Sequence, residues 1–217
     1  MWDWEFAFYV MPDILKAIRV TIAATLAGFA LALAVGLALA LLRRSAFKPL
    51  SLATIGFIEF VRSTPLLIQL FFIFYALPLS TGISFSAFQA GTIGLGFHYG
   101  TYLSEVYRSG IDAIPRGQWE AATALNFSRL RTWTKIILPQ AIPPTVPVMG
   151  NYLIAMFKET PLLSAITLVE MLQTAKIIGS DCYRYLEPFT LVGIFFLLLS
   201  YPASVLVKRL EFQLKQQ

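Results

Sequence analysis

Long apolar runs without any charge alternate with short charged stretches along this chain of 217 residues. Four such runs cover residues 20–42, 63–104, 136–157 and 188–207. One helix needs about 20 apolar residues to cross the hydrocarbon core of a bilayer, so each run is long enough to span it. The run of 42 residues is interrupted at 77–82 by proline, serine and glycine, so it is predicted to form two spans joined by a short loop.

The pattern predicts an all-α, polytopic membrane protein in which residues 1–217 form one transmembrane domain. Five spans are expected, near residues 14–42, 52–77, 87–108, 141–160 and 188–207. The aromatic N-terminal residues are expected to form a short anchoring segment at the membrane surface. Arg43 and Arg44 follow the first run in place of a small-residue cleavage site, which is typical of a retained span. Residues 166–178 are too polar to cross and are predicted to form a short helix on the outer face.

Composition excludes an ordinary soluble domain, because only 13% of the residues are charged and 57% are hydrophobic. A soluble domain carries about a quarter charged residues. Cys182 is the only cysteine, so neither an internal disulfide nor a cysteine metal cluster is possible. The net charge of +5 is attributed to membrane topology, and no nucleic-acid partner is expected.

The basic residues divide unevenly between the two sets of loops. Eleven lysines and arginines fall in the loops that follow the first, third and fifth spans, and five fall on the opposite face. Lysine and arginine concentrate on the cytoplasmic side of a membrane. The N-terminus is therefore predicted to lie outside and the C-terminus inside.

Only one of the predicted cytoplasmic loops is long, at residues 109–140. Residues 117–125 favour a helix, which Asn126 is expected to end because asparagine tolerates the left-handed backbone conformation. Ser128 can cap a second helix, and Pro139 is expected to close it. Two short helices joined at a sharp bend would form a compact projection from the inner face. An ordinary interfacial hairpin is the alternative.

This loop resembles the EAA loop of ABC importer permeases, whose short helix docks into a cleft on the ATPase subunit. The resemblance rests on Glu120, Ala121 and Ala122, followed by Asn126, Ile136, Leu138 and Pro139. Residues 61–67, 107–119, 157–163 and 186–189 are similar to the polar amino acid branch of that family, and the resemblance covers nearly the whole chain. The family usually has glycine where this chain has Asn126, and asparagine is the next best residue for such a bend.

The resemblance implies that one group of loop residues couples the chain to the ATPase. These residues are Gly117, Glu120, Ala121, Ala122, Asn126, Leu138 and Pro139. It implies the bacterial cytoplasmic membrane as the location, and as partners two ABC ATPase subunits, a second permease subunit in a homo- or heterodimer, an extracytoplasmic solute-binding protein and membrane lipid. No cofactor is expected on this chain, since ATP and Mg²⁺ belong to the ATPase.

Two short blocks at membrane depth repeat each other at residues 62–67 and 158–163, each with a basic residue followed by Thr-Pro-Leu-Leu. Proline removes a hydrogen bond of the helix, and the freed backbone groups must be buried in protein or line a water-filled cavity. Interrupted helices in two repeats indicate a transport site. The candidate pathway residues are Glu59, Arg62, Ser63, Thr64, Gln69, Asn151, Lys158, Glu159 and Thr160. Glu59 and Arg62 could pair on one helix face. The alternative is that the prolines only kink packed helices.

Three functions fit the pattern: an ABC permease for a polar amino acid or similar solute, an ion-coupled secondary transporter, and a membrane scaffold. His98, Tyr102 and Glu105 form a stripe that could relay protons in the second case or pack in a dimer interface. Nucleotide-binding, zinc-protease and nucleophile-elbow motifs are missing, so the chain is not expected to be an enzyme by itself. Residues 185–193 and the N-terminal segment are similar to the ectoine subgroup of the permeases.

Overall fold

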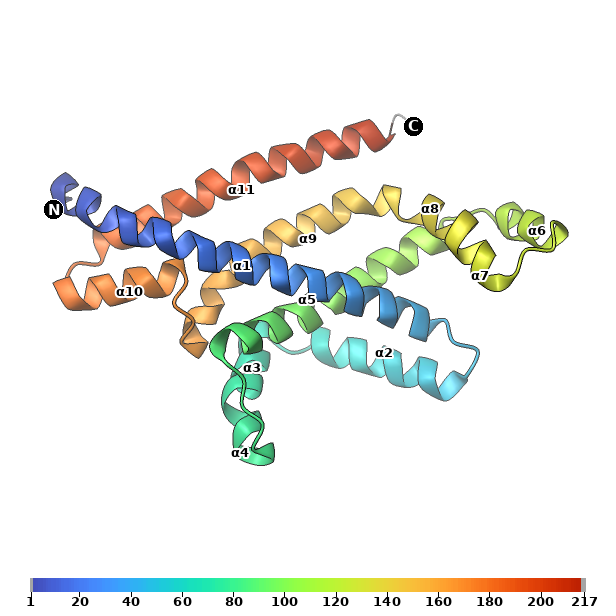
Figure 1. The fold of residues 1–217 in the computed structure, drawn as a ribbon, viewed down its shortest axis with the longest axis horizontal. Coiled ribbons are helices and arrows are strands. Elements are labelled where there is room, and N and C mark those ends of the chain that lie inside the picture. The colour runs from blue at the N-terminus through green and yellow to red at the C-terminus, as the bar shows by residue number, and fades with distance from the viewer. Residues whose placement is uncertain (1, 216–217) are drawn as a thin grey trace.

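The computed structural model describes residues 2–215, and every regular element in that part of the chain is a helix. Four helices run along one axis of the molecule (Figure 1): α1 (Trp4–Arg43), α5 (Ala87–Asp112), α9 (Val146–Glu159) and α11 (Leu186–Lys215). The other helices are α2 (Lys48–Arg62), α3 (Leu66–Phe71), the π-helix η1 (Phe72–Ala76), α4 (Leu77–Thr81), α6 (Arg116–Ala124), α7 (Arg129–Thr132), the π-helix η2 (Trp133–Ile137), α8 (Leu138–Ala141), the 3-10 helices η3 (Pro143–Thr145) and η4 (Thr160–Ile166), and α10 (Met171–Cys182).

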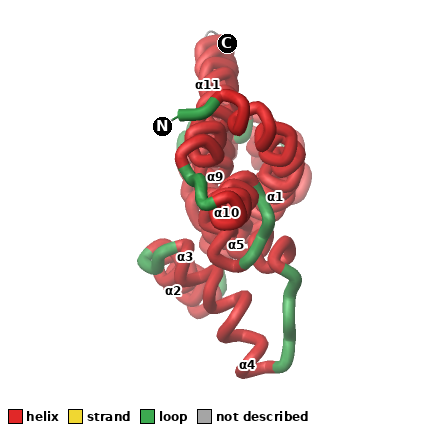
Figure 2. The backbone as a smooth tube through the Cα atoms, turned by 90° about the vertical axis from the view of Figure 1, so that its left-hand side faces the viewer, coloured by secondary structure: helices red, strands yellow, loops and turns green. Residues whose placement is uncertain are grey.

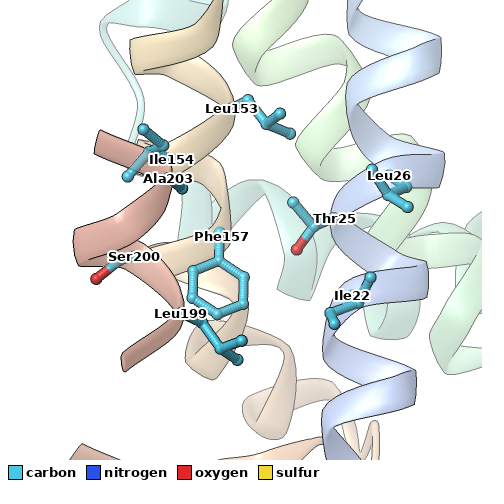
Figure 3. Close-up of a pocket in the computed structure, with 9 residues that line it drawn as sticks. All are labelled: Ile22, Thr25, Leu26, Leu153, Ile154, Phe157, Leu199, Ser200 and Ala203. Carbon is cyan, nitrogen blue, oxygen red and sulfur yellow. The ribbon is translucent and has the colours of Figure 1, made fainter. Parts of the chain in front are cut away.

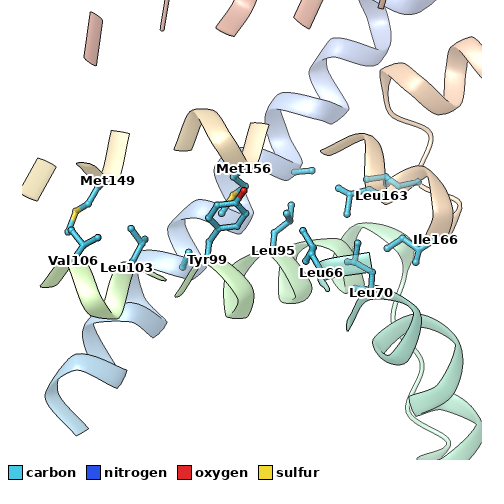
Figure 4. Packing of buried hydrophobic residues seen from close by; sticks show 14 of the residues in the cluster. Leu66, Leu70, Leu95, Tyr99, Leu103, Val106, Met149, Met156, Leu163 and Ile166 are labelled. Atoms are coloured by element: carbon cyan, nitrogen blue, oxygen red, sulfur yellow. The ribbon is translucent and has the colours of Figure 1, made fainter. Parts of the chain in front are cut away.

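Helices α1 and α5 form the centre of the bundle because small residues let their backbones approach closely. A Cβ atom added at Gly36 would lie 2.8 Å from Leu103 Cβ, and one added at Gly100 would lie 2.8 Å from Val35 Cγ1. Close backbone approach matters in a membrane, where lipid is as apolar as leucine and packing drives helix association. The apolar core around this pair extends to α3, α9 and η4 (Figure 4).

The first and last predicted spans are confirmed as helices, since α1 and α11 are each long and apolar enough to cross a bilayer. Up to four spans result if each bent helix pair counts as one. The aromatic N-terminal residues predicted to anchor at the membrane surface form the first turns of α1, which begins at Trp4. The side chain of Asp3 starts it by accepting hydrogen bonds from the backbone of Glu5 and Phe6 at 3.0 and 3.3 Å.

A continuous second span over 52–77 is also wrong. Helix α2 ends at Arg62, α3 begins at Leu66, and the two halves are bent by 103°. The residue before a proline is disfavoured in the helical conformation, so the chain breaks ahead of Pro65. As a result the arm from α3 to α4 turns away from the bundle (Figure 2).

The remaining predicted helices exist with shifted ends. The third begins at Ala87 as predicted and continues to Asp112 as α5, and the fourth begins at Val146 because Pro143 and Pro144 hold the chain in a 3-10 turn. The short outer helix is α10, which Glu170 caps by accepting hydrogen bonds from the backbone of Leu172 and Gln173 at 2.9 and 2.8 Å. The carboxylate of Glu170 is therefore buried at a helix N-terminus.

The loops predicted to be cytoplasmic lie together at one end of the molecule, with the C-terminus of α11 (Figure 1). At the opposite end Arg184 forms ion pairs with Asp3 and Glu187 and joins the start of α1 to the start of α11. The hydrogen bond from Arg184 holds the pKa of Asp3 below its usual value. The segments that the charge pattern assigned to one side of the membrane thus lie at one end of the molecule, and those assigned to the other side lie at the opposite end.

Candidate functional site

The first proline block creates free backbone carbonyls that Gln69 satisfies. The Gln69 amide nitrogen donates to the carbonyls of Val61 and Thr64 at 2.7 and 3.0 Å, and lies 2.8 Å from the Thr64 hydroxyl. Gln69 lies in α3, so its side chain reaches back across the break. Unpaired carbonyls are costly at membrane depth, and this amide therefore stabilises the sharp bend.

The second proline block changes the helix type with far less bending. Helix α9 ends at Glu159 and continues as the 3-10 helix η4. Thr160 is fully buried, and its hydroxyl donates to the carbonyl of Phe157 at 2.7 Å. The two blocks repeat in sequence, but only the first one breaks the backbone direction.

Three tyrosines connect the two blocks. The Tyr99 hydroxyl donates to Glu159 Oε2 at 2.8 Å, and the Tyr152 ring lies 6.2 Å from the Tyr99 ring and 5.8 Å from the Tyr102 ring. The guanidinium of Arg62 lies 4.9 Å from the centre of the Tyr102 ring. We call Tyr99, Tyr102 and Tyr152 the tyrosine cluster; Arg62 contacts it at one side and Glu159 at the other.

His98 fixes the first block to the same face of α5. Its Nδ1 atom lies 3.2 Å from the Gln69 side-chain oxygen, and its ring is 5.3 Å from that of Tyr102. Glu105, by contrast, pairs with Arg43 and Arg108. The predicted stripe is therefore divided between two sets of partners, and among the described residues no hydrogen bond continues it from His98 to Glu105.

The structure brings only part of the predicted pathway together. Arg62, Thr64, Gln69 and Glu159 lie around the tyrosine cluster. The residues placed elsewhere or exposed are Glu59, Ser63, Lys158 and Asn151. The predicted pair of Glu59 and Arg62 is wrong, because Arg62 stacks on a ring of α5.

Asn151 lies apart from the cluster, in a pocket between the start of α9 and the end of α11. Sequence reasoning missed Tyr99 and Tyr152. One signal was present for Tyr152, which precedes Glu159 by seven residues and so shares its helix face at about two turns.

Charge and aromatic surface make the tyrosine cluster a suitable place for a zwitterion. Arg62 can attract a carboxylate and Glu159 an ammonium group. Tyrosine ring faces also attract cations, with energies of about 0.5–1 kcal/mol at exposed sites and more when desolvated. A solute with both charges would therefore find a complement for each.

A second pocket, between α1, α9 and α11, has apolar walls (Figure 3). Its polar exceptions are Thr25 and Ser200, and the Thr25 hydroxyl already donates to the carbonyl of Thr21 at 2.8 Å. Such walls fit hydrocarbon and offer little to a polar solute. We therefore place the candidate solute site at the tyrosine cluster.

The predicted inner projection is a hairpin of α6 and the helices that follow it. Asn126 adopts the left-handed conformation with φ 54°, which confirms that it ends the first helix. The backbone N–H groups of Asn126 and Phe127 donate to the carbonyls of Thr123 and Ala122 at 2.9 and 3.0 Å. This is a Schellman closure, in which the first two residues beyond a helix satisfy its free carbonyls.

The second arm of the hairpin begins as predicted and ends later. Ser128 caps it by accepting a hydrogen bond from the backbone of Arg131 at 3.3 Å. The prediction that Pro139 closes the arm is wrong, because the helix continues to Ala141. The π-helical turn at Trp133–Ile137 widens the backbone just ahead of the proline, which lacks the N–H for a regular turn.

One face of α6 is open to a partner. Gly117, Glu120, Ala121 and Ala124 are exposed at spacings of three and four, which places them on one side of the helix. Ala122, which we expected to face a partner, is fully buried against the hairpin core. That core includes Trp119 and Trp133, whose rings pack edge to face 5.3 Å apart. The hairpin is thus a folded unit whose packed side includes Trp119 and Ala122 and whose small side chains Gly117, Ala121 and Ala124 remain exposed.

Asn126→Ala should loosen the hairpin, whereas Asn126→Gly should leave it intact. A left-handed residue other than glycine costs about 1–2 kcal/mol, and asparagine reduces that cost through local hydrogen bonding. Hydrogen–deuterium exchange of α6 should therefore accelerate in the alanine variant and stay at the wild-type rate in the glycine variant. Equal protection in both variants would contradict the assigned role of the left-handed turn.

Comparison with known proteins assigns the family. Residues 30–216 match the family described as the binding-protein-dependent transport system inner membrane component. The chain belongs to this family. As a transport system inner membrane component it is a multi-pass protein of the bacterial cytoplasmic membrane, the permease of an ABC importer. Family membership implies an ATPase, a partner permease subunit and a solute-binding protein.

Relatives of this inner membrane component cover nearly its whole length. A probable amino-acid ABC transporter permease of Sinorhizobium fredii is 43% identical over 212 residues, 98% of this chain and 91% of the relative. A probable amino-acid permease of Bacillus subtilis is 33% identical over 206 residues, 94% and 92% of the two chains. A crystal structure of an amino acid ABC transporter with histidines superposes with a TM-score of 0.89 at 31% identity, over 98% of this chain and 99% of the other. The all-helical architecture is therefore the type I permease fold.

Proposed function

We propose that this permease imports a polar amino acid or an amino-acid-like zwitterion, such as an ectoine, with ATP hydrolysed on a separate subunit. The observation that carries the proposal is the tyrosine cluster with Arg62 on one side and Glu159 on the other. The names of the relatives, two amino-acid permeases and an amino acid transporter, support the same class of solute.

We assign the solute pathway to the candidate residues around the tyrosine cluster. The bend at Ser63–Thr64 and the end of α9 at Glu159 both meet α5 there. Displacing α5 relative to α2 or α9 would change which side of the cluster is open. Alternating access needs only such a shift of one packed group of helices against another.

The exposed face of α6 is the surface that we assign to the ATPase. Gly117, Glu120 and Ala121 are small or polar and lie at the end of the molecule that holds the basic loops (Figure 1). The ATPase uses ATP from the cytosol, so the surface on which it docks must face the cytosol. This end of the molecule therefore lies inside, and the N-terminus lies outside. With that orientation the chain crosses the membrane five times, α2 to α4 forming a bent second crossing.

A second permease subunit is assigned to the arm of α3, η1 and α4. The arm exposes large apolar side chains, including Ile68, Phe72 and Leu79, of which Leu79 is 90% exposed. Arg62 is also exposed in the single chain, so the tyrosine cluster is open on that side. A second copy or a close relative packed against the arm would enclose the pathway.

Uptake by the reconstituted complex in vesicles tests the proposal. The permease, its ATPase and its binding protein are supplied with labelled glutamine, glutamate, arginine, histidine and ectoine. ATP-dependent uptake of at least one of these solutes is expected. Uptake that persists without ATP and follows an imposed proton gradient would support an ion-coupled carrier, and no uptake of any zwitterion would remove the proposed solute class.

Replacing both Thr64 and Thr160 by valine should lower uptake by about tenfold, which corresponds to 1.4 kcal/mol. Valine keeps the shape of each side chain and removes the hydroxyl that donates to a backbone carbonyl at each block. Membrane insertion should be unchanged, because valine is more apolar than threonine. Undiminished uptake by the double variant would defeat the assignment of both blocks to the pathway.

A further inference from the structure

Five charged side chains join the inner ends of α1 and α5. Arg43 pairs with Glu105, and Arg44 pairs with Asp112. Arg108 bridges both carboxylates, with Nε 2.8 Å from Glu105 Oε2 and a terminal nitrogen 3.0 Å from Asp112 Oδ2. We call these five residues the arginine clamp.

The arginine clamp is a connected network and not a set of isolated pairs. A single ion pair at this level of exposure contributes about 0.2–1 kcal/mol at most. Here Arg108 is shared by both carboxylates, so displacing one helix end disturbs several contacts together. Arg43, in the last turn of α1, also interacts favourably with the free carbonyls there.

Helix α5 connects the hairpin to the tyrosine cluster. It ends at Asp112, and α6 begins at Arg116, so three residues separate them. Ile111 and Ile114, on either side of that end, pack into the hairpin core. A Cβ added at Gly110 would lie 2.7 Å from the carbonyl oxygen of Ala141, so α5 also lies tightly against the second arm. Motion of the hairpin must therefore move the end of α5.

We infer that the arginine clamp makes α1 and α5 one rigid lever that carries motion from the hairpin to the tyrosine cluster. A single helix pushed at one end can tilt or slide against its neighbours. Close backbone packing along α1 resists tilting, and the clamp resists sliding at the end where the push is applied. Glu105, Arg108 and Asp112 are accordingly positioning residues, which act through α5 and touch neither solute nor nucleotide.

This inference rests on the proposed docking of an ATPase on α6, and its test is read only on complexes in which the ATPase is bound. The variant Glu105→Gln with Asp112→Asn keeps the size of both side chains and removes both negative charges. ATPase co-purification and ATP hydrolysis without solute should match the wild type. Stimulation of ATP hydrolysis by the loaded binding protein, and uptake per ATP, should fall by about fivefold or more, the usual lower range of an allosteric coupling.

A covalent cross-link between α1 and α5 in place of an ion pair tests whether the arginine clamp acts by holding the two helix ends together. Arg44→Cys with Asp112→Cys, in a Cys182→Ser background, removes the two ion pairs that Asp112 forms and leaves two thiols for a short bis-methanethiosulfonate reagent. Coupling should be low before cross-linking, should recover after it, and should be lost again on reduction. The single variant Arg44→Cys, treated identically, is the control and should not recover.

The outcomes separate the two proposals. If the wild-type permease fails to bind an ATPase, the proposed function is wrong. If the ATPase binds but the charge-neutral variant couples as the wild type does, only the lever is wrong. Cross-linking that lowers coupling further would also overturn it, because the inner ends of α1 and α5 would then have to separate during transport.

Discussion

Ala121→Trp should abolish ATP-driven uptake while the permease itself stays folded. Ala121 is exposed on the free face of α6, so the larger side chain meets nothing in this chain. Forcing extra atoms into a packed site costs about 1–3 kcal/mol, which corresponds to about 5- to 150-fold weaker association with the ATPase. Co-purification of the ATPase and uptake in vesicles both measure this loss.

Ala121→Ser is the matched control, because it changes polarity with almost no change in size, and it should retain both properties. Ala122→Trp distinguishes docking from folding. Ala122 is fully buried in the hairpin, so that variant should disrupt the hairpin and accelerate its hydrogen exchange. If Ala121→Trp bound the ATPase as tightly as the wild type, the docking surface would have to be sought elsewhere.

Gln69→Leu should destabilise the permease by about 2 kcal/mol and should eliminate most uptake. The substitution removes the side-chain donor to the Thr64 carbonyl and one of the donors to the Val61 carbonyl, which the Thr64 hydroxyl also bonds, and an unsatisfied buried group costs about 1–3 kcal/mol. It also removes the oxygen that contacts His98, so the first proline block would lose its connection to α5. Thermal unfolding in detergent and uptake in vesicles measure the two effects.

Gln89→Leu is the control for removing a glutamine. Gln89 closes an exposed capping box at the start of α5, where water can replace the lost hydrogen bonds. Its unfolding temperature should fall much less than that of the Gln69 variant. Equal stability of the Gln69 variant and the wild type would contradict the role of this amide in holding the bend.

Local patterns predicted the hairpin well because its structure depends on neighbouring residues. The left-handed turn at Asn126 and the cap at Ser128 both require particular side chains at particular positions, and both are present. The long helices were predictable for a similar reason, since an uncharged run leaves few alternatives to a helix in lipid. The end at Pro139 was mistaken because the π-helical turn ahead of it depends on packing against α5 and α6.

The tyrosine cluster could not be predicted from the same patterns. Tyr99 and Tyr152 lie in apolar helices, where a tyrosine most often packs or anchors at the interface. Their significance depends on Glu159, which is 60 residues from Tyr99 in the chain but 2.8 Å from its hydroxyl. The same holds for the arginine clamp, in which Arg43 and Glu105 are separated by 62 residues.

By itself the sequence determined that the chain is helical, that it lies in a membrane and which loops lie together at one end. These properties follow from hydrophobic length, charge distribution and local turn chemistry. Only the tertiary structure decided that the first proline block breaks its helix by 103° while its repeat does not. It also decided which polar residues meet. The physical reason is that freed backbone groups and buried charges are satisfied by partners distant in sequence, and only close packing of the helices determines which partners those are.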